Sequence, residues 1–191
     1  MTGHEDHSVA VRARQFEERL IGAGLASDDE IDEFLGTLYL NADPVNGQRM
    51  VARAWTDPEY RALLLADGNT AAEGLGLGPL RYQLRVVANT PDVHNVIVCT
   101  LCSCYPVSLL GPSPSWYKSF AYRSRTVREP HAVLAEFGVT LPPSVSVSVW
   151  DSISEARYMV LPMRPAGTDG LGPAELAGLV TVNGLIGTAL A

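Results

Sequence analysis

The sequence is poor in positive charge, in long apolar segments and in cysteine. Its 14 lysines and arginines stand against 21 aspartates and glutamates, which gives a net charge of −7. This balance argues against nucleic acids and anionic membranes as partners, because both bind basic protein surfaces. No apolar run is long enough to span a bilayer, and the N-terminus has neither the basic nor the apolar region of a signal peptide. We therefore expect a cytoplasmic protein.

The three cysteines of the chain, Cys99, Cys102 and Cys104, all lie in one hexapeptide. Their odd number, and the very small loops that any bridge would close, argue against a disulfide framework. A structural zinc site needs four ligands, usually in two distant pairs, and the second pair is missing. Of the four histidines only His94 is near, and we expect it to be a hydrogen-bonded core residue. A redox pair of Cys99 and Cys102 would leave Cys104 without a role.

The spacing favours a metal ion held by three thiolates and by donors within the loop. Cys102 and Cys104 can reach one ion only if the backbone folds tightly, which brings the main-chain nitrogens of Ser103 and Cys104 to the metal. An amide nitrogen binds a metal only after losing its proton, which a weak Lewis acid does not achieve. This argues for trivalent cobalt or iron, which suit thiolate ligands. Five protein donors leave a sixth position for water or substrate, as in a catalytic site.

The loop and its flanks follow the pattern of a known family. Residues 98–106 read Val-Cys-Thr-Leu-Cys-Ser-Cys-Tyr-Pro, and further matching segments lie at 50–58, 89–96, 110–111, 116–118, 122–123, 127–130, 157–162 and 164–168. These segments resemble nitrile hydratase alpha subunits, and the loop is also similar to that of the related thiocyanate hydrolase subunit. The resemblance covers about residues 47–187.

The resemblance implies that Cys99, Cys102 and Cys104 bind the metal through sulfur. Ser103 and Cys104 would bind it through their main-chain nitrogens. Cys102 is expected to be oxidised to sulfinate and Cys104 to sulfenate. Cys104 and Ser103 are the expected catalytic residues, with the sulfenate as nucleophile or base.

The resemblance also implies a cofactor and partners. Thr100 and Tyr105 are similar to the cobalt-type pattern, so Co(III) is expected, with Fe(III) as the alternative. A beta-type subunit would supply arginines to the oxidised cysteines. A metallochaperone or activator would load the cobalt.

Three charged residues, Asp151, Glu155 and Arg157, fall where the resemblance places groups around the metal loop. On sequence alone, Asp151 could instead be a turn residue and Glu155 a solvated surface charge. Tyr105 and Val107 are expected to line the substrate pocket.

The chain departs from the family pattern at three positions. Val107 stands where the family commonly has tryptophan, Leu80 where it has glutamine, and Ala88 where it has an acidic residue. Loss of an indole removes a wall of about 150–250 Å² from the pocket. The expected substrate is therefore a bulky nitrile, such as a heteroaromatic or nucleoside nitrile.

The hydrophobic patterning predicts the α+β class, with helices first and strands with intervening helices later. A helical N-terminal extension over residues 1–75 is expected to contact a partner subunit, and an α+β metal-binding catalytic domain over 76–191 is expected to follow. The resemblance implies a layered α-β-β-α core. Capping boxes are expected at Ser27 and Thr56. Expected helices are 7–23, 27–39, 48–54, 60–66, 115–127, 130–137 and 173–179, and expected strands are 82–88, 93–98, 145–149 and 157–161.

Three functions compete at this point. The resemblance implies hydration of a nitrile to an amide by the metal-binding subunit of a hetero-oligomer. A thiocyanate hydrolase would use the same loop on an anion. A non-catalytic metal-storage or redox-sensing thiol protein would hold a labile divalent metal and oxidise its thiols reversibly.

Overall fold

The structure, a computed structural model, describes residues 3–39 and 42–191. The chain divides into two compact units, residues 1–41 and 42–191. Residues 1–2 and 40–41, part of the expected N-terminal helical segment, lie outside the described residues. Within the described ranges, no helix is both long and apolar enough to cross a membrane.

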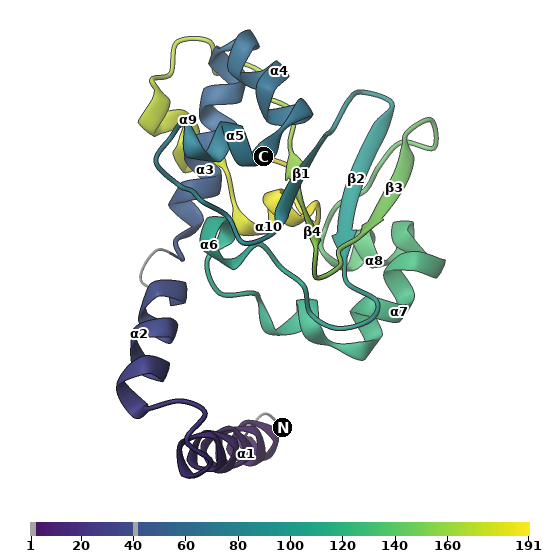
Figure 1. The fold of residues 1–191 in the computed structure, drawn as a ribbon. Coiled ribbons are helices and arrows are strands. Elements are labelled where there is room, and N and C mark those ends of the chain that lie inside the picture. The colour runs from purple at the N-terminus through teal and green to yellow at the C-terminus, as the bar shows by residue number, and fades with distance from the viewer. Residues whose placement is uncertain (1–2, 40–41) are drawn as a thin grey trace. The chain divides into compact units, whose positions relative to one another are not determined.

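The first unit consists, in its described part, of the helices α1 (Gly3–Gly22) and α2 (Asp28–Tyr39) (Figure 1). The expected capping box opens α2. The Ser27 N–H donates to the Glu30 carboxylate at 2.8 Å, and the Glu30 N–H donates to the Ser27 hydroxyl at 3.2 Å. Each side chain thus satisfies a main-chain donor that the first helical turn leaves unpaired.

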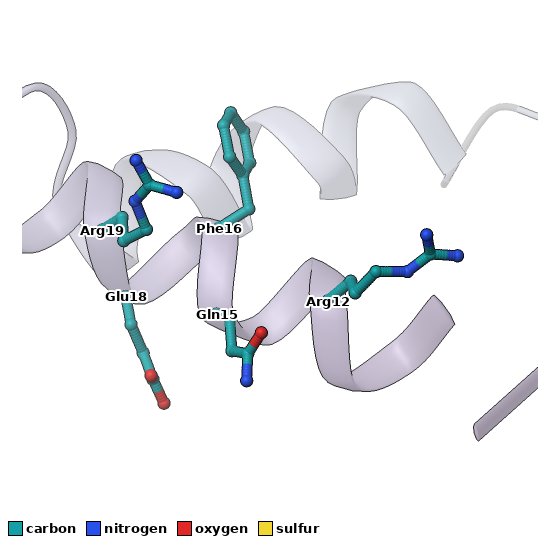
Figure 2. Close-up of a pocket in the computed structure, with 5 residues that line it drawn as sticks. All are labelled: Arg12, Gln15, Phe16, Glu18 and Arg19. Carbon is teal, nitrogen blue, oxygen red and sulfur yellow. The ribbon is translucent and has the colours of Figure 1, made fainter. Parts of the chain in front are cut away.

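Two hollows of about 560 Å³ each lie on this helical unit. The first is a surface of α1 alone, where Figure 2 shows Arg12, Gln15, Phe16, Glu18 and Arg19 pointing to different sides of the helix. The second is lined by both helices, with the large apolar side chains Phe16, Leu20, Leu25, Ile31, Phe34 and Leu35. The unit therefore carries apolar surface that its own two helices do not cover.

The second unit holds the strands and the remaining helices of the described residues. In chain order these are α3 (Pro44–Thr56), α4 (Pro58–Ala66), α5 (Gly68–Glu73), β1 (Gln83–Ala88), β2 (Val93–Val98), α6 (Val107–Leu110), η1 (Ser115–Lys118), α7 (Phe120–Arg128), α8 (Pro130–Glu136), β3 (Ser146–Asp151), β4 (Ala156–Leu161), α9 (Pro173–Leu179) and α10 (Val182–Ile186). The mixed helix and strand content agrees with the predicted class.

Helices α3, α4 and α5 each begin after an aspartate whose side chain caps the helix. Asp57 accepts from the Tyr60 N–H at 2.9 Å and caps α4. The prediction that Thr56 caps this helix was wrong, because Thr56 still belongs to α3 and donates to the Ala52 carbonyl at 3.2 Å. Asp57 is extended and Pro58 occupies the first helical position, which separates the two helices.

These three helices belong to the compact unit that begins at residue 42, although the sequence pattern grouped them with the N-terminal extension. Helices α4 and α5 pack against β1, and α3 packs against α6 and α9. Met50 of α3 and Leu64 of α4 are fully buried in the main core. Helical periodicity alone cannot show whether an apolar face meets the same chain or another one.

The four strands form two parallel pairs. Strand β1 pairs with β4, from Gln83 opposite Ala156 to Ala88 opposite Leu161. Strand β2 pairs with β3, ending with Val98 opposite Asp151, and β2 also contacts β4. The expected α-β-β-α layering stays a prediction. Because parallel strands end at the same edge, the loop that leaves β2 after Val98 starts beside the end of β3.

The helix expected at 115–127 is divided in two. Ser119 is extended between η1 and α7, and its hydroxyl accepts from the Tyr122 N–H at 3.1 Å. This break lets aromatic rings pack together in the main core. The ring centre of Trp116 lies 4.8 Å from that of Tyr122 and 4.7 Å from that of Phe137, in edge-to-face pairs. The pattern missed the break because a serine inside an amphipathic run does not by itself show a cap.

His94 of β2 is buried and hydrogen-bonded, as predicted. Its Nε2 lies 2.7 Å from the Gly187 carbonyl oxygen, so Nε2 carries the proton and donates. Its Nδ1 then accepts from the Asn89 amide nitrogen at 3.3 Å. The neutral imidazole thereby links β2 to the end of α10.

We expect the free energy of unfolding to decrease as the pH falls below about 6.5, the ordinary pKa of histidine. Burial lowers the pKa of His94, so between the two pKa values the unfolded chain binds a proton that the folded chain does not. The free energy of unfolding keeps its full value above the pKa that His94 has in the unfolded chain. It decreases as the pH falls toward the pKa of His94 in the folded chain, at up to about 1.4 kcal/mol per pH unit.

Urea unfolding of the metal-free protein from about pH 8 to about pH 5 measures how the free energy of unfolding changes with pH. His94→Gln should remove the contribution of His94, whereas His131→Gln, at an exposed position in α8, should keep it. An unchanged slope in His94→Gln would contradict the prediction.

Candidate metal centre

The three thiols converge where the chain leaves β2. The sulfur of Cys102 lies 3.3 Å from that of Cys99 and 3.1 Å from that of Cys104. Cys99 is buried, Cys104 half-buried and Cys102 exposed. This is the one group of three or more potential metal ligands among His, Cys, Asp and Glu side chains of the described residues.

The sulfur spacing fits ligands at right angles around one ion. At a metal–sulfur distance of about 2.3 Å, two ligands at a right angle are about 3.3 Å apart, and two at the tetrahedral angle about 3.8 Å apart. The observed 3.1 Å and 3.3 Å match the right angle. These two pairs are therefore spaced as in a six-coordinate site, and all three sulfurs lie within 4.8 Å of one another.

The thiols differ in how readily they ionise. Hydrogen bonds from the thiols of Cys104 and Cys99 lower the pKa of Cys102 to about 7. Burial raises the pKa of Cys104 to about 12, although the positive charge of Arg157 acts in the opposite direction. Because the thiolate binds metals and is the form that oxidises, exposed Cys102 is the more reactive sulfur before the metal binds.

Asp151 lies beside the loop and bonds to Thr100. It ends β3, and its carboxylate accepts from the Thr100 N–H at 2.9 Å and from the Thr100 hydroxyl at 2.5 Å. Glu155 is exposed in the connection between β3 and β4, where a hydrogen bond with Ser154 lowers its carboxyl pKa. Its main-chain carbonyl accepts from the Gln83 N–H at 2.7 Å.

Arg157 lies on β4 with its guanidinium under the end of the loop. Its Nη1 donates to the Tyr105 carbonyl at 2.6 Å, and its Cζ lies 4.5 Å from the ring centre of Tyr82. Its Nε is buried and has no hydrogen-bond partner within the described ranges. A buried donor without an acceptor costs about 1–3 kcal/mol, which an oxygen supplied to this site would relieve.

The two expected pocket residues occupy different surroundings. Tyr105 is 4% exposed, and its ring lies 5.1 Å from that of Tyr117 in an edge-to-face pair. Its hydroxyl faces the Leu110 carbonyl at 3.5 Å. Val107 begins α6 and packs half-buried against the main core.

Two residues that hold the loop were not among the predicted site residues. Arg123 of α7 donates from Nε to the Cys99 carbonyl at 2.9 Å and from Nη2 to the Thr100 carbonyl at 2.7 Å. The hydroxyl of buried Tyr117 donates to the Cys104 carbonyl at 2.9 Å. Both lie in segments that carry the family resemblance, but their partners are main-chain oxygens, which no residue pattern shows.

Comparisons with known proteins agree with this geometry. The family described as "Nitrile hydratase, alpha chain" matches residues 7–189. The cobalt-containing nitrile hydratase subunit alpha of Pseudonocardia thermophila is 48% identical over 94% of this chain and 89% of its own. The low-molecular weight cobalt-containing nitrile hydratase subunit alpha of Rhodococcus rhodochrous is 46% identical over 97% of this chain and 90% of its own.

Solved structures show the same likeness. A double mutant of the Fe-type nitrile hydratase of Comamonas testosteroni Ni1 has a TM-score of 0.86 at 40% identity, over 99% of this chain and 92% of that one. A recombinant thiocyanate hydrolase with partially modified cobalt centres has a TM-score of 0.85 at 42% identity, over 99% of this chain and 90% of that one. With its converging cysteines, the chain belongs to the nitrile hydratase alpha-chain family.

Proposed function

We propose that this chain is the metal-binding alpha subunit of a nitrile hydratase, which adds water to a nitrile to give an amide at a low-spin Co(III) centre. The observation that carries the proposal is the convergence of the Cys99, Cys102 and Cys104 sulfurs, all within 4.8 Å of one another, in a loop of this family. When bound, the metal would supply Lewis acidity toward the nitrile or a water molecule.

In this proposal the loop supplies all protein ligands. The three thiolates bind through sulfur, and Ser103 and Cys104 bind through their main-chain nitrogens. Exposed Cys102 leaves one side of the sulfur cluster open to solvent, where substrate can approach. Ser103 and Cys104 are the proposed catalytic residues, and an oxidised Cys104 would act as nucleophile or base.

We propose cobalt rather than iron as the resident metal. The two cobalt-containing relatives share 46% and 48% identity with the chain, and the iron-type structure shares 40%. Both metals accept soft sulfur donors, so the loop residues and the loading machinery decide which one enters. A metallochaperone or activator that delivers cobalt is part of the proposal.

We propose Cys102 as the sulfinate and Cys104 as the sulfenate. The exposure of Cys102 supports its deeper oxidation, because oxidation-prone cysteines are accessible to solvent. The unpaired Nε of Arg157 supports an oxygen near Cys104, because this arginine is close enough to act against the rise that burial causes in the Cys104 thiol pKa. Asp151 and Arg157 would hold the loop and its oxygens. Glu155 would contribute through its main-chain carbonyl, which accepts from the Gln83 N–H.

The substrate is proposed to be a bulky nitrile, heteroaromatic or of the nucleoside type. Val107 follows the loop directly and fills less space than the indole common in the family. Tyr105 would border this pocket through its main chain, because its ring is buried against that of Tyr117.

The partner is proposed to be a beta-type subunit that supplies arginines to the oxidised cysteines. The chain exposes large apolar side chains on two of its parts. Phe16 and Phe34 are exposed on the first unit, and Leu101 of the loop and Phe120 of α7 are 86% and 82% exposed. Exposed apolar side chains in such number favour a protein partner.

One purified sample, expressed with its partner subunit in cobalt-supplemented medium, tests the proposal. We expect about one tightly held cobalt per chain, with peptide mass increments of two oxygens on Cys102 and one on Cys104. Zinc with unmodified thiols would overturn the proposal and favour the non-catalytic thiol protein.

Substrate panels separate the two enzymatic functions. The thiocyanate hydrolase structure, at a TM-score of 0.85, makes that activity the second candidate. We expect amide formation from nitriles and no turnover of thiocyanate, with larger kcat/KM for heteroaromatic than for small aliphatic nitriles. A clear preference for small aliphatic nitriles would contradict the proposed bulky substrate.

A further inference from the structure

The peptide group that joins Cys99 to Thr100 is held at both of its polar ends by side chains of opposite charge. Its carbonyl oxygen accepts from the Arg123 Nε at 2.9 Å. Its N–H donates to the Asp151 carboxylate at 2.9 Å. The plane of this peptide is therefore fixed from two sides, by α7 and by the end of β3.

The same two side chains also hold the next link of the loop. The Thr100 carbonyl accepts from the Arg123 Nη2 at 2.7 Å, and the Thr100 hydroxyl donates to Asp151. Arg123 thus uses two nitrogens of its planar fork on two consecutive carbonyl oxygens, a geometry that a lysine ammonium cannot reproduce. Hydrogen bonds that involve a charged group are about twice as strong as neutral ones.

The helix that carries Arg123 is itself anchored to β2. The neighbouring Tyr122 is buried and donates from its hydroxyl to the Ile97 carbonyl at 2.7 Å. The hydroxyl of Ser119 caps the start of α7. The guanidinium therefore has a fixed place relative to the strand that ends immediately before Cys99.

We propose that Arg123 is a positioning residue of the metal centre. It sets the direction in which the chain leaves β2, so that the Cys99 sulfur points to the same place as those of Cys102 and Cys104 before a metal binds. Asp151 balances its charge across the peptide, so the clamp adds no net charge beside the thiolates. The inference rests on the proposed metal-binding function, but it depends neither on which metal is bound nor on which nitrile is the substrate.

Removal of this clamp should weaken metal retention, because groups that orient metal-bearing segments typically change metal affinity by about 10–100-fold. Arg123→Met keeps an apolar stem of similar length and removes both donors. Arg123→Lys keeps the charge but replaces the two nitrogens of the planar fork by a single one, and it provides a milder variant that preserves folding. Arg125→Met is the matched control, because Arg125 lies on the same helix and pairs with Glu129 and Glu136 on the exposed surface.

The experiment compares these variants with the unaltered protein, each expressed with its partner subunit in cobalt medium. We measure the rate of cobalt loss to a chelator, the sulfur-to-cobalt charge-transfer absorption and the free energy of unfolding by urea. Arg123→Met should lose cobalt about 10–100-fold faster with a shifted absorption band, and Arg123→Lys should be intermediate. Arg125→Met should match the unaltered protein in both cobalt measurements.

Unchanged cobalt loss and an unchanged absorption band in both Arg123 variants would overturn the inference, even if their unfolding free energies fall. If the unaltered protein holds cobalt and hydrates nitriles, that result leaves the proposed function in place. If the unaltered protein itself holds neither cobalt nor iron, the proposed function fails, and the inference fails with it.

Discussion

Cys102→Ser is expected to remove cobalt from the assembled protein and to reduce nitrile hydration by at least about a thousandfold, because a bound metal is worth several kcal/mol of transition-state stabilisation. Cys102 lies between the other two sulfurs, at 3.3 Å from Cys99 and 3.1 Å from Cys104. Its loss removes the central thiolate, and a hydroxyl is a much poorer ligand for a soft metal. Metal analysis and the amide-forming rate measure the two effects.

Two loop variants sharpen this test. Leu101→Ala alters an exposed neighbour that has no ligand atom in its side chain, so cobalt content should be retained. Ser103→Ala should also retain cobalt, because the proposed ligand at this position is the main-chain nitrogen. Cys102 is exposed, so Cys102→Ser should leave the unfolding free energy of the metal-free protein within about 0.5 kcal/mol of its unaltered value. Full cobalt occupancy in Cys102→Ser would contradict the assignment of this sulfur as a ligand.

Gly187→Ala is expected to destabilise the fold by about 3–5 kcal/mol, from the sum of a left-handed backbone and an overpacked core position. Gly187 ends α10 with a φ of 89°, a region that favours glycine. A Cβ at this position would overlap the main-chain carbonyl of Asn95, which β2 holds rigidly. The shift would also disturb the hydrogen bond between the Gly187 carbonyl and His94.

Gly138→Ala is the matched control for this prediction. Gly138 has a similar φ of 83°, but a Cβ there would meet nothing within 4 Å. It should cost only the backbone strain, about 1–2 kcal/mol. Urea unfolding of both metal-free variants separates strain from overlap, and equal losses would show that close packing at Gly187 does not matter.

Much of the candidate site can be predicted from the sequence because its ligands are local. Cys99, Cys102 and Cys104 lie within six residues, so their closeness along the chain can be seen without the fold. The histidine nearest to them was expected in the core, and His94 is buried there. The capping box at Ser27 could also be predicted from the sequence, because its two residues, Ser27 and Glu30, lie within one helical turn.

Contacts between distant segments were harder to predict. The Thr56 cap was wrong because two adjacent residues could both serve, and the extended backbone at Asp57 decides between them. The division of 115–127 depends on Ser119 and on how Trp116 and Phe137 pack together. Helices α3 to α5 belong to the second unit because α4 and α5 pack on β1. The hydrophobic periodicity of a helix does not show which element it packs against.

The sequence alone determined the candidate metal ligands and the family, because both depend on short local segments. Only the tertiary structure decided how the loop is held. Parallel pairing of β2 with β3 brings Asp151 to Thr100, and the packing of α7 brings Arg123 to the carbonyls of Cys99 and Thr100. The physical reason is that these contacts join a side chain to main-chain groups, and every residue has the same main-chain groups, so only the path of the folded chain selects the partners.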